Sequence, residues 1–184
     1  MKEYNLDDIR EKYARLICEV GLNLQPGQNL FIWANQLEMA PMARQVMKTA
    51  YQMGSKLVSV LYNDEIAAKI RFENAPRDSF DGYPSWKTDA RLKTMSEGDA
   101  VLWIGGPDPN LLQGYDPELI EKAARAYGRH FKPIRDLISK NASQWLLVCP
   151  PSSSWALRVF PDDSPEVAEG KLWEAVIKAC RLDE

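Results

Sequence analysis

Residues 99–128 read DAVLWIGGPDPNLLQGYDPELIEKAARAYG, and this stretch decides the fold. Ala100 to Ile104 form a short, continuous apolar run, which predicts a strand buried on both faces. The glycines and prolines of 105–109 force the chain to turn. Asp116 then predicts a helix N-cap, with Pro117 at the first helical position. A strand, a turn and a capped helix make half of a βαβ unit.

The rest of the chain repeats this alternation. Three further strands are predicted at 29–34, 57–62 and 145–149, because each is a short apolar run between turn residues. Helical periodicity predicts helices at 6–20, 38–53, 65–74, 85–95, from 117, after 152 and from 165. Strands that alternate with helices indicate an α/β fold. We expect one domain, residues 1–184, with a mostly parallel sheet of four or more strands and Rossmann-like layers of helices on both faces.

Four local features carry more specific expectations. Residues 75–84 are predicted to be an irregular surface loop. The helix from Pro117 is expected to weaken at Gly128, and Pro133 is expected to start a further turn or helix. Trp86 is expected to anchor its helix on the core or to line a groove. Val20 is expected on the buried face of the first helix.

Composition excludes several classes of function. The chain has 184 residues and a formal net charge of -3, and no basic stripe occurs, so a nucleic-acid partner is not expected. No apolar run approaches the roughly 20 residues that cross a membrane, so no membrane partner is expected. The cysteines Cys18, Cys149 and Cys180 are odd in number and far apart. This pattern favours reduced thiols, packing roles and a cytoplasmic location.

Histidine is the scarcest informative residue. His130 is the only histidine in the sequence, whereas hydrolytic zinc sites usually use two or three histidines or mix His with Glu or Cys. None of the motifs HExxH, GxSxG, GxxxxGK[ST] or GxGxxG occurs. A self-contained metal hydrolase is therefore hard to build from this chain, and His130 is interpreted as a surface or packing residue.

Polar residues follow the predicted strands, where α/β proteins bind ligands. Glu38 lies after the first strand, and Asn63, Asp64 and Glu65 lie after the second. One interpretation is structural, because carboxylates and Asn side chains stabilise helix N-termini. The other is functional: Glu38 faces a ligand, and 63–65 contact a substrate amine or a partner. The sequence leaves both open.

Several collinear segments resemble the N-terminal region of the metalloaminopeptidases related to aminopeptidase T and aminopeptidase S. The segments are YARLICEVGLNLQPGQ (13–28), ANQLEMAP (34–41), YNDE (62–65), PDPNLLQGYDPE (107–118), KPIRD (132–136), SSSWALRVFPD (152–162) and KLWEAVIKAC (171–180). The resemblance implies hydrolytic removal of the N-terminal residue of a peptide substrate with two divalent metal ions, zinc, cobalt or magnesium in different members. It also implies a homodimer that encloses a large cavity.

The resemblance places the metal ligands of the family in a second, C-terminal domain. None of those ligands can be carried over to this chain, so we expect no catalytic residue, no metal ligand and no cofactor within it. The chain is then expected to be a fragment, the substrate-side domain of a longer enzyme, inactive without its C-terminal catalytic domain. The candidate cavity walls are Glu38, Asn63, Asp64, Glu65, Gly106 and Asp108.

Two other functions are weighed against this one. The chain could be a stand-alone α/β module that binds a small ligand or a protein at its strand-end loops. It could also be an assembly domain that forms oligomers. The codons downstream of Glu184 discriminate between the enzyme fragment and the stand-alone module. A stop codon favours the module, and a long extension with a histidine-rich stretch favours the enzyme fragment.

Overall fold

The computed structural model describes residues 5–105, 108 and 110–182. Its centre is a sheet of four parallel strands, β1 (Leu30–Ala34), β2 (Val58–Tyr62), β3 (Ala100–Ile104) and β4 (Trp145–Val148). The strand order is β2-β1-β3-β4, so β1 and β3 lie inside the sheet and β2 and β4 form its edges. All four predicted strands are therefore present, and their parallel pairing is confirmed.

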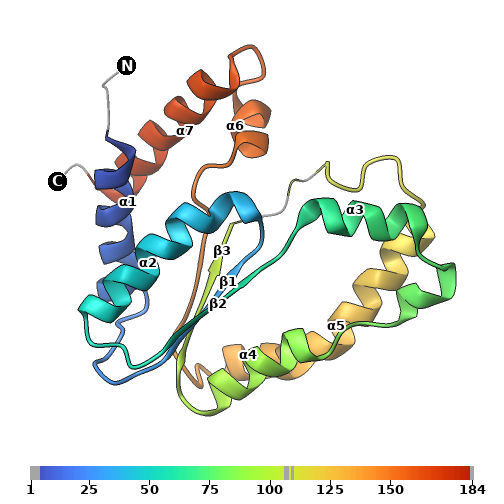
Figure 1. Ribbon diagram of the computed structural model, residues 1–184, viewed down its shortest axis with the longest axis horizontal. Helices are drawn as coiled ribbons and strands as arrows, with labels where there is room; N and C mark the ends of the chain where they lie inside the picture. The colour runs from blue at the N-terminus through green and yellow to red at the C-terminus, as the bar shows by residue number, and fades with distance from the viewer. Residues whose placement is uncertain (1–4, 106–107, 109, 183–184) are drawn as a thin grey trace.

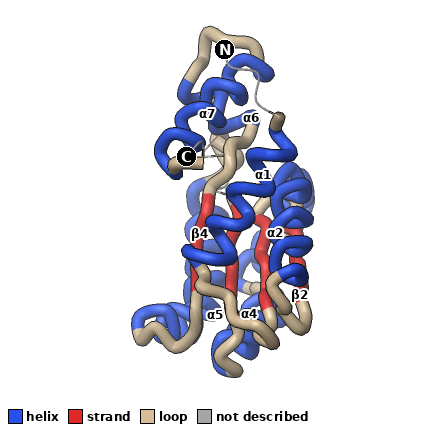
Figure 2. Tube along the Cα trace, turned by 90° about the vertical axis from the view of Figure 1, so that its left-hand side faces the viewer, coloured by secondary structure: helices blue, strands red, loops and turns tan. Residues whose placement is uncertain are grey.

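Helices cover both faces of this sheet (Figures 1 and 2). The helical elements are α1 (Leu6–Arg15), η1 (Leu16–Gly21), η2 (Leu37–Met39), α2 (Ala40–Gln52), α3 (Glu65–Asn74), η3 (Arg77–Asp81), α4 (Trp86–Ser96), α5 (Pro117–Ser139), α6 (Ser153–Val159) and α7 (Pro165–Cys180). The predicted α/β class is confirmed. In the part of the chain that the structure describes, no helix has the length and hydropathy needed to cross a membrane.

The two faces of the sheet carry two separate cores, because successive strand side chains point to opposite sides. In β1, Leu30 and Ile32 belong to the core beneath α1, α2 and α7, whereas Phe31 and Trp33 belong to the core beneath α4 and α5. The strand β3 alternates in the same way. Every residue of β1 and β3 is buried, as predicted for strands covered on both faces.

The helix N-cap predicted at Asp116 is confirmed, and other helices begin in the same way. The side chain of Asp64 accepts hydrogen bonds from the backbone N–H groups of the first turn of α3, and Asp116 does the same for α5. Ser152 caps α6 and Ser164 caps α7. These short polar side chains satisfy backbone donors that have no partner inside the helix.

The predicted interruption near Gly128 and Pro133 is wrong. The helix α5 runs unbroken for 23 residues with Pro133 inside it. Its buried residues Leu119, Ala126 and Ile134 recur every seven or eight positions and form one apolar stripe. Burial of that stripe along the whole helix outweighs the hydrogen bond that Pro133 cannot donate.

The first helix also departs from its prediction, because it changes from α to π geometry at Leu16. In η1 the backbone N–H of Leu22 donates to the carbonyl of Ile17 at 2.8 Å, five residues back. The wider π turn changes the direction of the side chains relative to an α-helix. Val20 is consequently 70% exposed and not part of the buried face.

Two predictions in the segment before β3 are corrected. Residues 75–84 include the 3₁₀ helix η3, and its Phe80 is fully buried (0% exposed) against the ring of Phe72. A buried aromatic residue holds this segment in a fixed place. Trp86 is 57% exposed, so it does not anchor α4 on the core. Thr88, Arg91 and Met95 are the buried residues of that helix.

The cysteines and the histidine occupy packing positions. Cys18 is buried, Cys149 and Cys180 are half-buried, and all three are unpaired thiols. Burial raises the pKa of the Cys18 thiol to about 12, so this sulfur stays protonated at neutral pH. The centre of the His130 imidazole lies 5.5 Å from that of the Tyr83 ring, and the two rings are tilted by 34°. A packing interpretation therefore fits each of these residues.

Candidate functional site

The loops that leave β1, β2 and β3 meet at one edge of the sheet, because these strands are parallel neighbours. The backbone N–H of Asn63 donates to the carbonyl of Ala34 at 2.9 Å, and the N–H of Asn35 donates to the carbonyl of Ile104 at 2.9 Å. These bonds continue the ladder one residue beyond each strand. They place Asn35, Asn63 and Gly105 side by side at the carboxyl end of the sheet.

Glu65 cross-links the three loops. Its Oε1 accepts a hydrogen bond from Nε2 of Gln36 at 3.1 Å and another from the backbone N–H of Asp108 at 3.1 Å. Gln36 follows β1, Glu65 begins α3 after β2, and Asp108 follows β3. Two predicted site residues, Glu65 and Asp108, are thus brought together, and the carboxylate of Glu65 fixes the relative positions of the loops.

The turn after β3 requires a glycine. Gly105 has φ +85°, in the left-handed region that favours glycine. A Cβ atom at this position would lie 2.9 Å from Cγ of Met39 and 3.2 Å from Oε1 of Gln36. The carbonyl of Gly105 accepts a hydrogen bond from Nδ2 of Asn35 at 2.5 Å.

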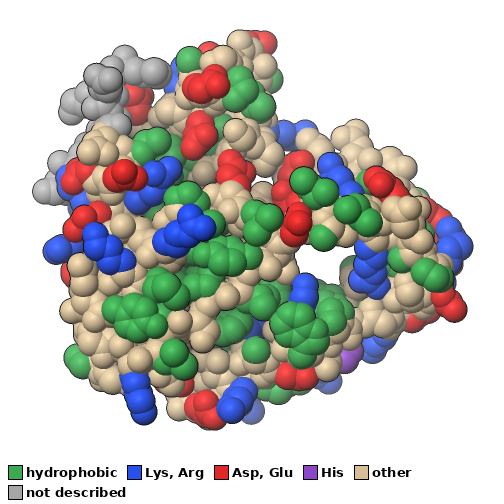
Figure 3. Space-filling view, in the orientation of Figure 1, with side chains coloured by type: hydrophobic (Ala, Val, Ile, Leu, Met, Phe, Trp, Pro, Cys, Tyr) green, Lys and Arg blue, Asp and Glu red, His purple; other side chains and the backbone are tan. Residues whose placement is uncertain are grey.

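A cavity of about 640 Å³ opens beside these loops. It is lined by Asn35, Tyr62, Asn63, Asp64, Glu65, Ala67, Ala68, Arg71, Phe72, Pro84, Lys87 and Leu111. In Figure 3 the molecule is hollowed between the segment of α3 and the segments of α4 and α5. Three of the predicted site residues, Asn63, Asp64 and Glu65, line one cavity together.

Charges of both signs face this cavity. Nζ of Lys87, from α4, donates to Oδ1 of Asn63 at 3.3 Å. Nη2 of Arg71 donates to the backbone carbonyls of Ser79 and Gly82, at 3.0 and 3.3 Å, and so holds the segment around η3. The exposed Asp64 supplies a negative charge. Such a site suits a zwitterionic ligand, because carboxylates can meet an amine and Lys87 can meet a carboxylate or a carbonyl oxygen.

The other predicted site residues lie apart from this cavity or serve local structure. Oε1 of the exposed Glu38 accepts from the backbone N–H of Ser153 at 2.8 Å, so Glu38 ties η2 to the start of α6. Oδ1 of Asp108 accepts from the backbone N–H of Asn110 at 2.9 Å in a local turn. Gly106 lies outside the described residues.

Sequence reasoning missed Asn35, Gln36, Arg71 and Lys87. Asn35 and Gln36 directly follow the first strand, so the rule that singled out Asn63 to Glu65 could have found them. Arg71 lies in α3, nine residues after the last residue of β2, and Lys87 lies near the start of α4, 25 residues after it. Only the packing of α3 and α4 brings them to the cavity, and no local signal marks them.

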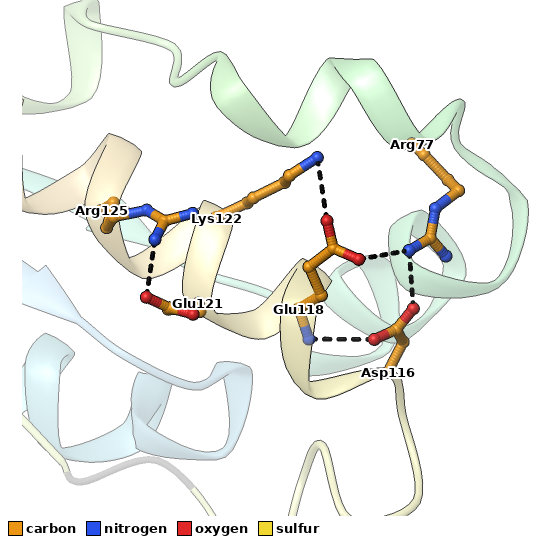
Figure 4. Close-up of polar contacts among 6 residues, drawn as sticks. All are labelled: Arg77, Asp116, Glu118, Glu121, Lys122 and Arg125. Carbon is orange, nitrogen blue, oxygen red and sulfur yellow. Dashed lines mark hydrogen bonds and ion pairs between the residues drawn. The ribbon is translucent and has the colours of Figure 1, made fainter.

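A second polar cluster lies at the start of α5, and it is structural (Figure 4). Nη2 of Arg77 contacts Oδ2 of Asp116 at 2.8 Å and Oε2 of Glu118 at 3.2 Å. These contacts join η3 to the N-terminus of α5. The hydrogen bond from Arg77 and the backbone N–H of Glu118 lower the pKa of Asp116 below its ordinary value.

The described residues do not fit a metal centre. Within 5–105, 108 and 110–182, no group of three or more His, Cys, Asp or Glu side chains is placed to hold a metal ion. The carboxylates of Glu65 and Glu38 instead accept hydrogen bonds, from the side-chain amide of Gln36 and from the backbone N–H of Ser153 respectively.

Comparison with known proteins identifies the family. The family model described as thermophilic metalloprotease (M29) matches residues 6–184. The chain belongs to the M29 family. The predicted resemblance to the aminopeptidase T and aminopeptidase S group is thereby confirmed, and the family description is that of a metal-dependent peptidase.

Curated M29 relatives agree with this assignment. Aminopeptidase 2 of Geobacillus stearothermophilus is 39% identical over 174 residues, and Aminopeptidase T of Thermus thermophilus is 35% identical over 174 residues. Each alignment covers 95% of this chain and 42% of the relative. The solved structure of wild-type AmpT from Thermus thermophilus superimposes with a TM-score of 0.90 at 34% identity. The match covers 95% of this chain and 44% of that one, so the chain spans less than half the length of these relatives.

Proposed function

We propose that residues 1–184 form the N-terminal, substrate-side domain of a metal-dependent aminopeptidase that removes N-terminal residues from peptides. The observation that carries this proposal is the match of 95% of the chain to 44% of AmpT at a TM-score of 0.90. The match covers nearly all of this chain but less than half of AmpT, and such coverage is expected when a chain corresponds to one domain of a two-domain enzyme.

The metal ions of such an enzyme would be held outside this chain, because the described residues do not provide a ligand cluster. Two divalent ions, zinc, cobalt or magnesium, would supply a polarised scissile carbonyl and an activated water. The C-terminal catalytic domain would be the partner that carries them. The residues of this chain would then contribute binding and exclusion of solvent.

The strand-end cavity is the proposed wall of the substrate site. Its contributors from the predicted set are Asn63, Asp64 and Glu65, and the backbone N–H of Asp108 is hydrogen-bonded to Glu65 beside it. Asp64 is the carboxylate best placed to meet the free amine of a peptide, because it is exposed and lines the cavity. Glu65 would keep the wall in shape through its two hydrogen bonds.

The test compares the 184-residue chain with a longer protein that contains the C-terminal region. We expect the short chain to hold no stoichiometric zinc, cobalt or magnesium by elemental analysis. We also expect it not to hydrolyse leucine or phenylalanine anilides, and we expect the longer protein to hydrolyse them. Hydrolysis of these anilides by the short chain at the rate of the longer protein would refute the proposal.

A homodimer in the cytoplasm completes the proposal for the whole enzyme. The unpaired thiols of Cys18, Cys149 and Cys180 suit a reducing compartment. Sedimentation of the longer protein tests the dimer.

The alternative, a stand-alone α/β module that binds a ligand or a protein, is favoured by the preformed strand-end cavity. A stop codon directly after Glu184 would support that alternative.

A further inference from the structure

Lys87 is a cation of the strand-end cavity whose charge is not neutralised. Its Nζ donates to Oδ1 of Asn63 at 3.3 Å, and the centre of the Trp86 ring lies 5.7 Å away. Among the residues that the structure describes, no carboxylate forms an ion pair with it. An ammonium group has three donors, so two of them remain for a ligand. The side chain is half-buried and lines the cavity, where a ligand can reach it.

The other cation on the cavity wall, Arg71, serves the wall itself. Its Nη2 donates to the backbone carbonyls of Ser79 and Gly82, and its guanidinium carbon lies 4.7 Å from the ring centre of Phe80. These contacts hold the segment around η3 against α3. Lys87 is therefore the group of this cavity that is best suited to bind an anion.

The position of Lys87 is fixed by the elements around it. Its neighbours Thr88 and Arg91 in α4 are each 1% exposed, so this part of the helix is held in the core. Asn63 is held at the end of β2, since its backbone N–H donates to the carbonyl of Ala34 at 2.9 Å. A donor that is already in place loses little freedom on binding, which favours recognition of one group at one point.

The acidic residues beside Asn63 limit the class of ligand. Asp64 and Glu65 line the same cavity, and their charges oppose a phosphate or another multiply charged anion but favour an amine. Asp64 directly follows the residue that Lys87 contacts. Because an extended peptide spans about 3.3–3.6 Å per residue, a peptide of two or three residues is long enough to reach from one charge to the other.

We propose that Lys87 binds the C-terminal carboxylate of a dipeptide or tripeptide substrate and so selects short peptides with a free C-terminus. This inference rests on the proposed function. The amine would lie toward Asp64, and the apolar side chains would lie against Ala67, Ala68 and Phe72. The volume of about 640 Å³ falls within the range of about 300–1,000 Å³ of small-molecule sites, which suits a short peptide and not a folded chain.

The experiment measures KM and kcat of the longer protein for three dipeptides, from the leucine released. We expect the KM for leucyl-leucine to be at least tenfold below that for leucyl-leucinamide, which has the same shape without the carboxylate. The α-amide of leucyl-aspartic acid carries its carboxylate on a side chain and should behave like leucyl-leucinamide. Equal KM values for leucyl-leucine and its amide would overturn the proposal. A KM for the aspartic α-amide as low as that for leucyl-leucine would overturn the assignment to the C-terminus.

Three variants locate the effect. Lys87→Gln removes the charge and keeps a donor for Asn63, and the preference for leucyl-leucine over its amide should fall to within twofold. Lys87→Arg keeps the charge and should retain most of the preference. Lys93→Gln is the matched control, because Lys93 lies on the same helix but is exposed and contacts Glu97, and the preference should stay within twofold of the original. An unchanged preference in Lys87→Gln would overturn the role of Lys87.

Failure of this inference can be distinguished from failure of the proposed function. Leucine anilide has no carboxylate, so its hydrolysis by the longer protein tests the proposed function alone. Hydrolysis of the anilide together with equal KM values for leucyl-leucine and its amide would overturn only the role of Lys87. If the longer protein hydrolyses none of these compounds, both are overturned. If Lys87→Gln does not fold, the comparison of leucyl-leucine with its amide in the original protein still decides.

Discussion

At the scale of single residues, Glu65 has the largest structural role in the strand-end loops. Its Oε1 is the acceptor for the side chain of Gln36, which is 3% exposed, and for the backbone of Asp108. A buried donor that loses its acceptor costs more free energy than the hydrogen bond itself contributes, because the donor stays desolvated.

The substitution Glu65→Ala should therefore destabilise the protein by about 1–3 kcal/mol. Glu65→Gln is the matched control, since its amide oxygen can still accept both bonds, and its loss should be smaller. Urea unfolding followed by circular dichroism measures both variants. Equal stability of Glu65→Ala and the original protein would contradict the cross-linking role.

Asp116 makes stability depend on pH. The Arg77 contact and the Glu118 backbone N–H lower the pKa of Asp116 in the folded state, below its ordinary value of 3.8. A depressed folded pKa stabilises the protein above the unfolded pKa, and this contribution is lost as the pH falls through the folded pKa. The direction is thus a loss of stability in acid.

Asp116→Asn should remove this contribution and retain the helix cap, because Asn is also a good N-cap residue. The urea midpoint of the variant should lie below that of the original protein at pH 6, and the two should converge as the pH falls below 3.8. Added salt should reduce the difference at pH 6, because the contact is exposed. A constant difference across the whole pH range would exclude Asp116 as its source.

At the scale of elements, α5 shows how tertiary packing overrides a local signal. Pro133 lies inside the helix and exposed to solvent, while Leu119, Ala126 and Ile134 are buried along one side. A proline in a helix interior costs about 3 kcal/mol through its missing N–H and its ring. The protein tolerates this cost because the apolar stripe is continuous.

Pro133→Ala should therefore raise the free energy of unfolding, by about 1–3 kcal/mol. Pro117→Ala on the same helix is the control, since proline at the first helical position loses no hydrogen bond, and this change should be nearly neutral or slightly destabilising. Thermal unfolding compares the two. A less stable Pro133→Ala protein would show that the ring is needed for packing.

The elements also show which features can be read from sequence. The apolar run Ala100–Ile104 and the cap Asp116 are local signals, and the strand and the helix start predicted from them are confirmed. The capping interpretation of Asp64 is also confirmed. The π turn at Leu16 exposes Val20, and Phe80 is buried against the ring of Phe72; the periodicity of apolar residues does not predict either feature. At the candidate site, Asn63 to Glu65 follow a strand and were predicted, whereas Lys87 reaches the cavity only through the packing of α4.

At the scale of the whole molecule, one sheet serves two cores. The strands β1 and β3 contribute to both, whereas α7 closes one core and α5 the other. The two cores share their central strands. Loss of side-chain packing on one face of the sheet is therefore expected to destabilise the packing on the other face. We expect a single cooperative unfolding transition.

Ile177→Ala in α7 and Ile134→Ala in α5 test this expectation. Both side chains are buried, so each change should cost about 2–5 kcal/mol. In each variant, far-ultraviolet circular dichroism and tryptophan fluorescence should give one coincident midpoint. Separate midpoints in either variant would indicate cores that unfold independently.

The hydrogen bonds of Glu65 have a mechanical consequence for the rim of the sheet. Three loops that are far apart along the chain are joined at one oxygen atom, so a displacement of any one of them is transmitted to the other two. A molecule that displaces the first turn of α3 would therefore also displace the turn after β3, 43 residues away in sequence, through the hydrogen bond between Glu65 and Asp108.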